Sequence, residues 1–93
     1  MRKVEPKAAD LAFSRQEVLD VEIIGKSPKE WNLVFTAIDP VTEKEVTYGL
    51  LTRRGKLKTW ADPRTLMSFL CDRGISEGKF RLEEGFSSEK DDS

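Results

Sequence analysis

The chain has 93 residues and a formal net charge of −1, with 35% charged and 38% hydrophobic residues. This length suits one domain with a modest core, and the composition excludes a membrane-spanning or low-complexity protein. The absence of histidine excludes His-based nucleophile arrangements and histidine-containing metal sites, and the single cysteine, Cys71, excludes an intramolecular disulfide. We therefore expect a cytoplasmic protein that is not an enzyme and has no catalytic residue, cofactor or metal.

Three segments differ in composition. Residues 1–13 mix charges, alanines and a proline without a sustained period, so we expect a flexible N-terminal tail. Residues 14–84 hold the periodic apolar positions and form a single predicted domain. Residues 85–93 are acidic and serine-rich, which predicts a disordered tail that either lies over basic residues of the domain or stays in solvent.

The first periodic segment favours a strand. Apolar side chains recur at every second position, at Leu19, Val21 and Ile23. This period and the β-branched residues predict a half-buried strand that ends near Gly25. Ser14 and Glu17 have the spacing of a helix capping box, so residues 14–20 could instead begin a helix.

Two further strands follow the same pattern. Their alternating side chains are Trp31, Leu33, Phe35 and Ala37 in the first, and Val46, Tyr48 and Leu50 in the second. Asp39 and Pro40 are typical of a turn between them. We expect these strands to form an antiparallel hairpin.

Residues 51–82 supply the remaining predicted elements. Gly55 suits a tight turn after two arginines, and residues 56–60 would return as a fourth strand. Phe80 and Leu82 alternate with basic residues in a short fifth strand. Between these strands lies a predicted helix over residues 62–73.

Both ends of this helix are marked. Asp62 can cap the first turn, Pro63 suits the first helical position, and Gly74 suits the left-handed position after the last turn. The apolar stripe that would face a sheet is Leu66, Phe69 and Leu70. The predicted fold is α+β, with a four- to five-stranded, mainly antiparallel sheet and this one helix packed on one face.

The best candidates for partner contact are basic residues near the turn, together with one aromatic residue. They are Arg53, Arg54, Lys56, Lys58, Trp60 and Arg64. Clustered cations beside an aromatic ring can bind phosphates and stack a base. The alternative interpretation is a solubilising hairpin, because lysines on edge strands discourage aggregation.

Residues 52–75 resemble small accessory proteins of plasmids and integrative elements, including partition-associated ones. The shared features are the Arg-Gly turn, Trp60 after alternating basic residues, the Leu66, Phe69 and Leu70 stripe, and the Gly74-Ile75 ending. The resemblance implies a bacterial or mobile-element protein with a role in DNA maintenance or partner binding. It brings no catalytic residues.

We conclude from the sequence that a small interaction or adaptor protein is the leading hypothesis. It would bind a protein partner through a sheet edge or through the basic hairpin that ends at Trp60. The alternative is a nucleic-acid-binding accessory protein that uses the basic residues from Arg53 to Arg64. A homodimer formed through an unpaired sheet edge is a further possibility, and no membrane contact is expected.

Overall fold

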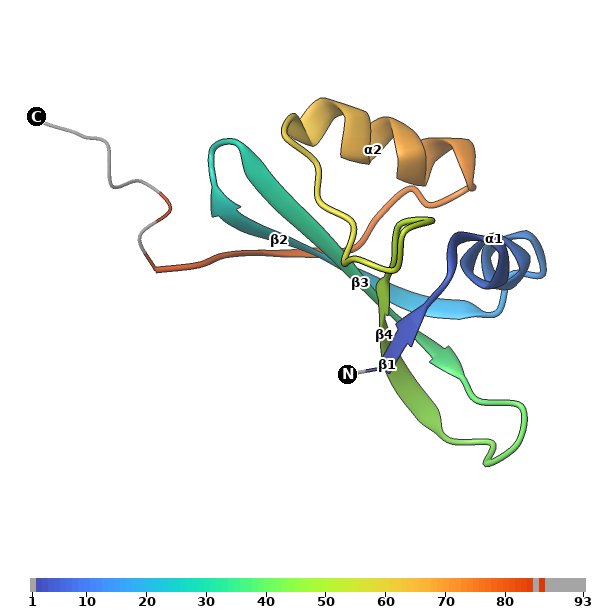
Figure 1. Ribbon diagram of the computed structural model, residues 1–93. Helices are drawn as coiled ribbons and strands as arrows, with labels where there is room; N and C mark the ends of the chain where they lie inside the picture. The colour runs from blue at the N-terminus through green and yellow to red at the C-terminus, as the bar shows by residue number, and fades with distance from the viewer. Residues whose placement is uncertain (1, 85, 87–93) are drawn as a thin grey trace, which may run out of the picture.

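The computed structural model describes residues 2–84 and residue 86, in five strands and two helices. In chain order these are β1 (Arg2–Val4), α1 (Pro6–Ser14), β2 (Val18–Ser27), β3 (Glu30–Ile38), β4 (Glu45–Leu50), α2 (Pro63–Asp72) and β5 (Lys79–Leu82). The strands form one sheet in the order β1-β4-β3-β2-β5, and both helices pack on the same face of it (Figure 1). The α+β class is confirmed. Of the predicted acidic tail, residues 85–93, only Phe86 is among the described residues.

The sheet is mixed, which corrects the expectation of a mainly antiparallel one. β3 pairs antiparallel with β2 and with β4, so the predicted hairpin is present and Phe35 lies opposite both Val21 and Tyr48. β1 pairs parallel with β4, and β5 pairs parallel with β2. Each parallel pair joins segments far apart in the sequence, and the alternation within a strand does not identify such a partner.

The predicted fourth strand, residues 56–60, is not a strand of this sheet. It makes two isolated bridges instead, from Leu57 to Leu51 and from Trp60 to Trp31. The two tryptophans exchange backbone hydrogen bonds of 2.8 and 2.9 Å. The segment therefore lies beside the start of β3, beyond the end of β4, and β1 supplies the fifth strand in its place.

α1 corrects the expectation of a single helix, because it lies in the segment predicted as a tail. Pro6 occupies its first turn, where the missing N–H costs no intrahelical bond. Ala9 and Phe13 are four positions apart and are buried against the sheet. The helix ends at Ser14, and Gln16 then adopts a positive φ of 57° just before β2 begins. The alternative helix over residues 14–20 is therefore not formed.

The predicted caps of α2 are confirmed. The Asp62 carboxylate accepts a hydrogen bond of 2.8 Å from the amide of the second helical residue. At the other end Gly74 has a φ of 81°, and the amide of Ile75 donates to the carbonyl of Leu70 at 3.0 Å. These contacts form a Schellman ending and fix where the chain leaves the helix.

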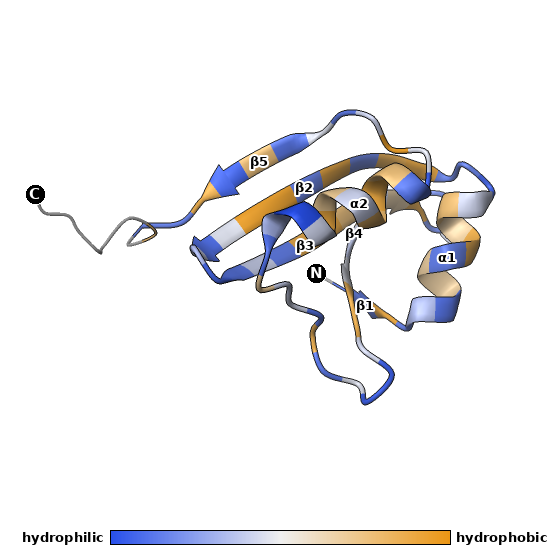
Figure 2. Ribbon diagram, turned by 90° about the horizontal axis from the view of Figure 1, so that it is seen from above, coloured by the Kyte–Doolittle hydropathy of each residue, from blue (hydrophilic) through white to orange (hydrophobic). Residues whose placement is uncertain are grey.

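The core lies between the two helices and the central strands. Its most buried large side chains are Phe35 and Leu66. The Phe35 ring lies 5.2 Å from that of Phe13 and 5.6 Å from that of Tyr48, between ring centroids. Phe35 thus joins α1 to two strands. Figure 2 shows that the helices cover the middle of the sheet and leave β5 at an outer edge.

Asp39 fixes the turn between β3 and β4. Its carboxylate accepts a hydrogen bond of 2.8 Å from the Val41 amide and forms an ion pair with Arg2 of β1. The pKa of Asp39 is held below its ordinary value of 3.8, mainly by the hydrogen bond from the Val41 amide and next by the hydrogen bond from Arg2. The folded carboxyl therefore binds a proton more weakly than the unfolded one. Its stabilisation is complete above the unfolded pKa and is lost as the pH falls through the folded pKa.

We expect Asp39→Asn to lower the stability at neutral pH and to flatten its decline on acidification, because asparagine binds no proton in this range. Urea unfolding at a series of pH values from neutral to below the ordinary pKa of aspartate measures both effects. Glu84→Gln, at an exposed carboxylate far along the chain, is the control. An Asp39→Asn curve parallel to that of the unchanged protein would contradict the prediction.

Candidate functional site

The basic loop, residues 52–58, is organised around Thr52. The Thr52 hydroxyl accepts hydrogen bonds of 3.3 Å from the amides of Arg54 and Lys56. The Thr52 amide donates to the Lys56 carbonyl at 2.6 Å, and Gly55 closes the loop with a φ of 82°. These backbone groups bond within the loop, and the side chains of Arg53, Arg54 and Lys56 are exposed to solvent.

The structure separates the predicted site residues into three groups: the cations of the basic loop, the buried Trp60, and Arg64 at the start of α2. Arg53, Arg54 and Lys56 are exposed on the basic loop. None of them, nor Lys58, forms an ion pair with a carboxylate of the described residues. No described carboxylate therefore neutralises their positive charge.

Trp60 is buried, with 7% of its surface exposed. Its ring packs against that of Phe69 from α2, with centroids 5.4 Å apart, and the Lys58 ammonium lies 5.3 Å from its centroid. The ring therefore belongs mainly to the core and does not present an open face for stacking a base. It holds Lys58 in place through a cation–π contact.

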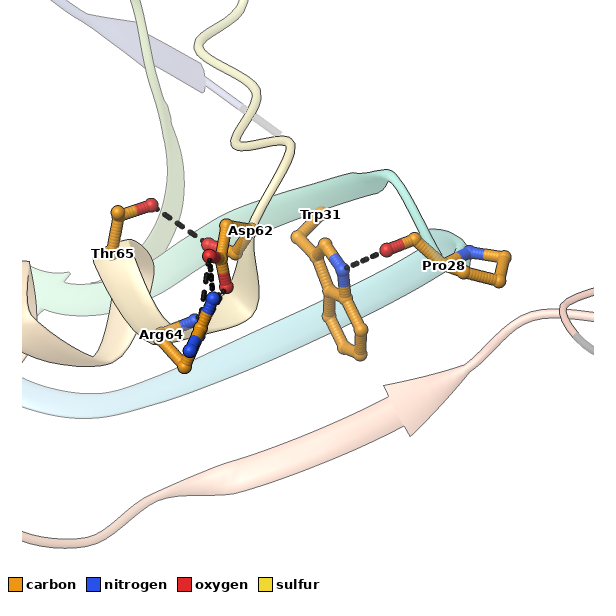
Figure 3. Close-up of polar contacts among 5 residues, drawn as sticks. All are labelled: Pro28, Trp31, Asp62, Arg64 and Thr65. Atoms are coloured by element: carbon orange, nitrogen blue, oxygen red, sulfur yellow. Dashed lines mark hydrogen bonds and ion pairs between the residues drawn. The ribbon is translucent and has the colours of Figure 1, made fainter.

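Arg64 lies apart from the loop, in the first turn of α2. Its guanidinium binds both oxygens of the Asp62 carboxylate, at 3.2 and 2.8 Å (Figure 3). This contact raises the pKa of Arg64 and lowers that of Asp62. The same view shows Trp31 nearby, with its indole N–H donating to the Pro28 carbonyl at 3.1 Å. Arg64 serves the helix start and adds little free positive charge to the basic loop.

A hollow of about 610 Å³ lies between α2 and the basic loop, and we call it the α2–loop hollow. Apolar groups of Leu50, Trp60 and Phe69 contribute to its lining. Arg53 and Lys58 line its loop side. The α2 side carries hydroxyl groups and one carboxylate, from Thr65, Ser68 and Asp72. Cationic and apolar groups therefore meet in one concave site.

Arg73 forms a fixed wall of this hollow. Its guanidinium stacks 3.6 Å from the centroid of the Phe69 ring and donates to the Phe69 carbonyl at 3.1 Å. It also forms an ion pair of 3.0 Å with Asp10 of α1. The charge of Arg73 is thus compensated, whereas Arg53 and Lys58 have no ion-pair partner in the part of the chain that the structure describes. Arg73 could not be identified from the sequence, because its ion-pair partner, Asp10, lies on α1, a helix that the sequence did not predict.

A second hollow, of about 480 Å³, lies beside the first between the basic loop and the start of α1. Arg53 and Thr52 line both hollows, and Lys7 lines only the second. Arg53 therefore stands where the two meet, which makes it the most central of the predicted contact residues.

β5 is a second exposed feature, and it forms one edge of the sheet. Its apolar side chains, Phe80 and Leu82, are 72% and 48% exposed. The basic side chains that alternate with them form ion pairs with β2, from Lys79 to Asp20 and from Arg81 to Glu22, each at 3.5 Å. The sequence predicted this strand but did not single out its residues as a site. The alternation of basic and apolar residues was the available signal.

No group of three or more Cys, Asp or Glu side chains among the described residues is placed to hold a metal ion. Cys71 is an exposed thiol on α2. No helix in the described part of the chain has the length and apolar character to span a bilayer.

No protein-family model, curated protein or solved structure matches the chain. The resemblance of residues 52–75 to plasmid and integrative-element accessory proteins therefore stays a prediction. The two surface features that stand out among the described residues are the α2–loop hollow and the β5 edge.

Proposed function

We propose that this protein is a non-catalytic interaction module that binds an acidic segment of a protein partner in the α2–loop hollow. The observation that carries the proposal is the pairing of an apolar lining with two cations, Arg53 and Lys58, that form no ion pair with a carboxylate of the described residues. A DNA-maintenance setting, implied by the resemblance to mobile-element proteins, is compatible with such a role.

The shape of the hollow supports an anchored side chain. Its volume of about 610 Å³ lies within the usual range for ligand sites, roughly 300–1,000 Å³. Trp60 and Phe69 are held by their mutual contact, so the lining is formed before a partner arrives. An aliphatic or aromatic side chain entering a rigid apolar site gains affinity without an ordering cost on this side.

The charged residues of the hollow determine which residues can flank the bound apolar side chain. Arg53 and Lys58 are on the loop side, whereas Asp72 is on the helix side. A bound segment with carboxylates next to its apolar anchor would place them toward the loop and away from Asp72. Such contacts are weakened by salt because Arg53 is exposed and Lys58 is only half-buried.

The test uses labelled peptides in which a leucine or phenylalanine is flanked by aspartate and glutamate. We expect binding by fluorescence anisotropy, with amide shifts confined to α2 and the basic loop in NMR spectra. Charge reversal in Arg53→Glu with Lys58→Glu should weaken binding by about tenfold or more. Arg15→Glu with Lys29→Glu makes the same change in net charge at exposed sites outside the hollow and should leave binding unchanged.

Two control peptides separate the contributions. Replacing the apolar anchor by serine should abolish binding, and replacing the carboxylates by amides should weaken it and remove its salt dependence. Equal binding of all three peptides, or no binding of the acidic one at about 1 mM, would contradict the proposal.

Nucleic-acid binding is the second candidate, because Arg53, Arg54 and Lys56 are exposed and without ion pairs in the described part of the chain. Duplex and single-stranded DNA, titrated at low and high salt, test it. If phosphates are the ligand, changing all three to glutamine should reduce the salt slope by about 2 to 3. DNA binding without peptide binding would favour this candidate over the first.

A further inference from the structure

The open side of β5 is defined by its hydrogen bonds. The amide of Glu83 donates to the Gly25 carbonyl of β2 at 2.9 Å. Since backbone groups of successive residues point to opposite sides of a strand, the backbone of Arg81 also faces β2, as the register requires. The N–H and C=O groups of Phe80 and Leu82 therefore point outward, and no strand among the described residues pairs with them.

The side chains of this edge are self-complementary. In an antiparallel pair centred on Arg81, Phe80 of one copy lies opposite Leu82 of the other, and the reverse pair follows by symmetry. Both apolar pairs fall on the helix face, because Phe80 and Leu82 share a face with Ile23 and Gly25. The outward backbone groups of these same residues would then exchange four hydrogen bonds.

The charges favour the same register. Lys79 of one copy lies opposite Glu83 of the other, twice over, so two opposite-charge pairs flank the central arginines. The arginines face each other, but each already forms an ion pair with its own Glu22. A register centred on Phe80 would instead set Lys79 opposite Arg81 twice, and like charges directly opposite are destabilising.

We propose that two copies of this chain associate through β5, in antiparallel register centred on Arg81, and extend the sheet across both. The occupant of the edge is a second copy because the sequence from Lys79 to Glu83 complements itself in both apolar and charged positions. Figure 2 shows β5 as the outermost strand, away from both helices. The α2–loop hollow has no β5 residue in its lining, so this association is independent of the proposed function.

Sedimentation equilibrium over a range of concentrations gives the dissociation constant of the dimer. Lys79→Glu and Glu83→Lys should each raise it by about tenfold, because each sets two like-charge pairs across the edge. An equimolar mixture of these two variants should form a heterodimer close to the original in affinity. The double variant Lys79→Glu with Glu83→Lys should likewise dimerise.

The mixture is decisive because it restores the pairs between copies without changing either monomer. Within its own chain Lys79 contacts Asp20, and Glu83 contacts Arg81. Each substitution changes one of these contacts within the monomer, and mixing the variants does not restore it. As a second disruption, Phe80→Asp should abolish the dimer, whereas Met67→Asp, at a 55% exposed position of α2, should not.

Three outcomes would overturn the proposal. One is a monomer at about 1 mM, which would leave the edge to a different partner or to none. Another is a dimer that Phe80→Asp does not weaken. The third is a mixture of the two charge variants that associates no better than either variant alone, since this rules out the register.

Discussion

Phe35→Ala is expected to lower the free energy of unfolding by about 3–5 kcal/mol. Phe35 is 2% exposed and lies at the centre of the sheet, in contact with the rings of Phe13 and Tyr48. Its removal leaves a cavity between α1 and the sheet. Domains of this size are stable by only about 5–15 kcal/mol, so the variant should populate the unfolded chain at moderate temperature.

Urea unfolding followed by circular dichroism measures this loss. Val41→Ala is the control, because Val41 is 88% exposed and its truncation should change the stability by less than about 0.5 kcal/mol. Phe35→Leu keeps most of the volume and should cost much less than alanine. A loss below about 1 kcal/mol for Phe35→Ala would contradict the central place of this ring.

The elements that the sequence predicted well are those specified by neighbouring residues. Asp62 and Gly74 mark the ends of α2 through their own backbone conformation and hydrogen bonds, which do not depend on distant partners. The alternation around Phe35 likewise predicts β3 and its hairpin with β4. Local rules are sufficient for both.

What the sequence did not reveal depends on distant contacts. α1 is short, and only Ala9 and Phe13 of it are buried, so its apolar signal is faint without the sheet that covers them. β1 and β5 pair with strands far away along the chain. No local pattern specifies those parallel partners.

In the candidate site, too, the features specified by neighbouring residues could be predicted from the sequence, and those that depend on distant contacts could not. The exposed cations of the basic loop could be predicted from the run of basic residues around Gly55. The position of Trp60 could not, because Trp31 and Phe69, which enclose it, belong to β3 and α2. Trp60 was predicted to offer a face for stacking, but its buried ring is instead part of the lining of the α2–loop hollow. This hollow forms only when α2 packs beside the basic loop.

Gly78→Ala is expected to cost about 1–3 kcal/mol, because the added methyl group has no room. Its Cβ would lie 2.4 Å from Cγ2 of Val21 and 3.0 Å from the Val21 carbonyl oxygen. Gly78 immediately precedes β5, so the clash should push that strand away from β2. Hydrogen exchange should then accelerate at the Glu83 amide, which bonds to β2 in the unchanged protein.

A double-mutant cycle separates this clash from a general loss of glycine. In a Val21→Ala background the Cγ2 contact is absent, so Gly78→Ala should cost less, although the carbonyl contact prevents full rescue.

Gly74→Ala is the matched control. There a Cβ meets no described atom within 4 Å, but φ is 81°, so the substitution should cost about 1 kcal/mol through backbone strain. That cost should not change with Val21→Ala. Equal losses from Gly78→Ala in both backgrounds would show that β5 does not lie as close to Val21 as the structure places it. Because the proposed dimer needs β5 held against β2, Gly78→Ala should also weaken association, and Gly74→Ala should not.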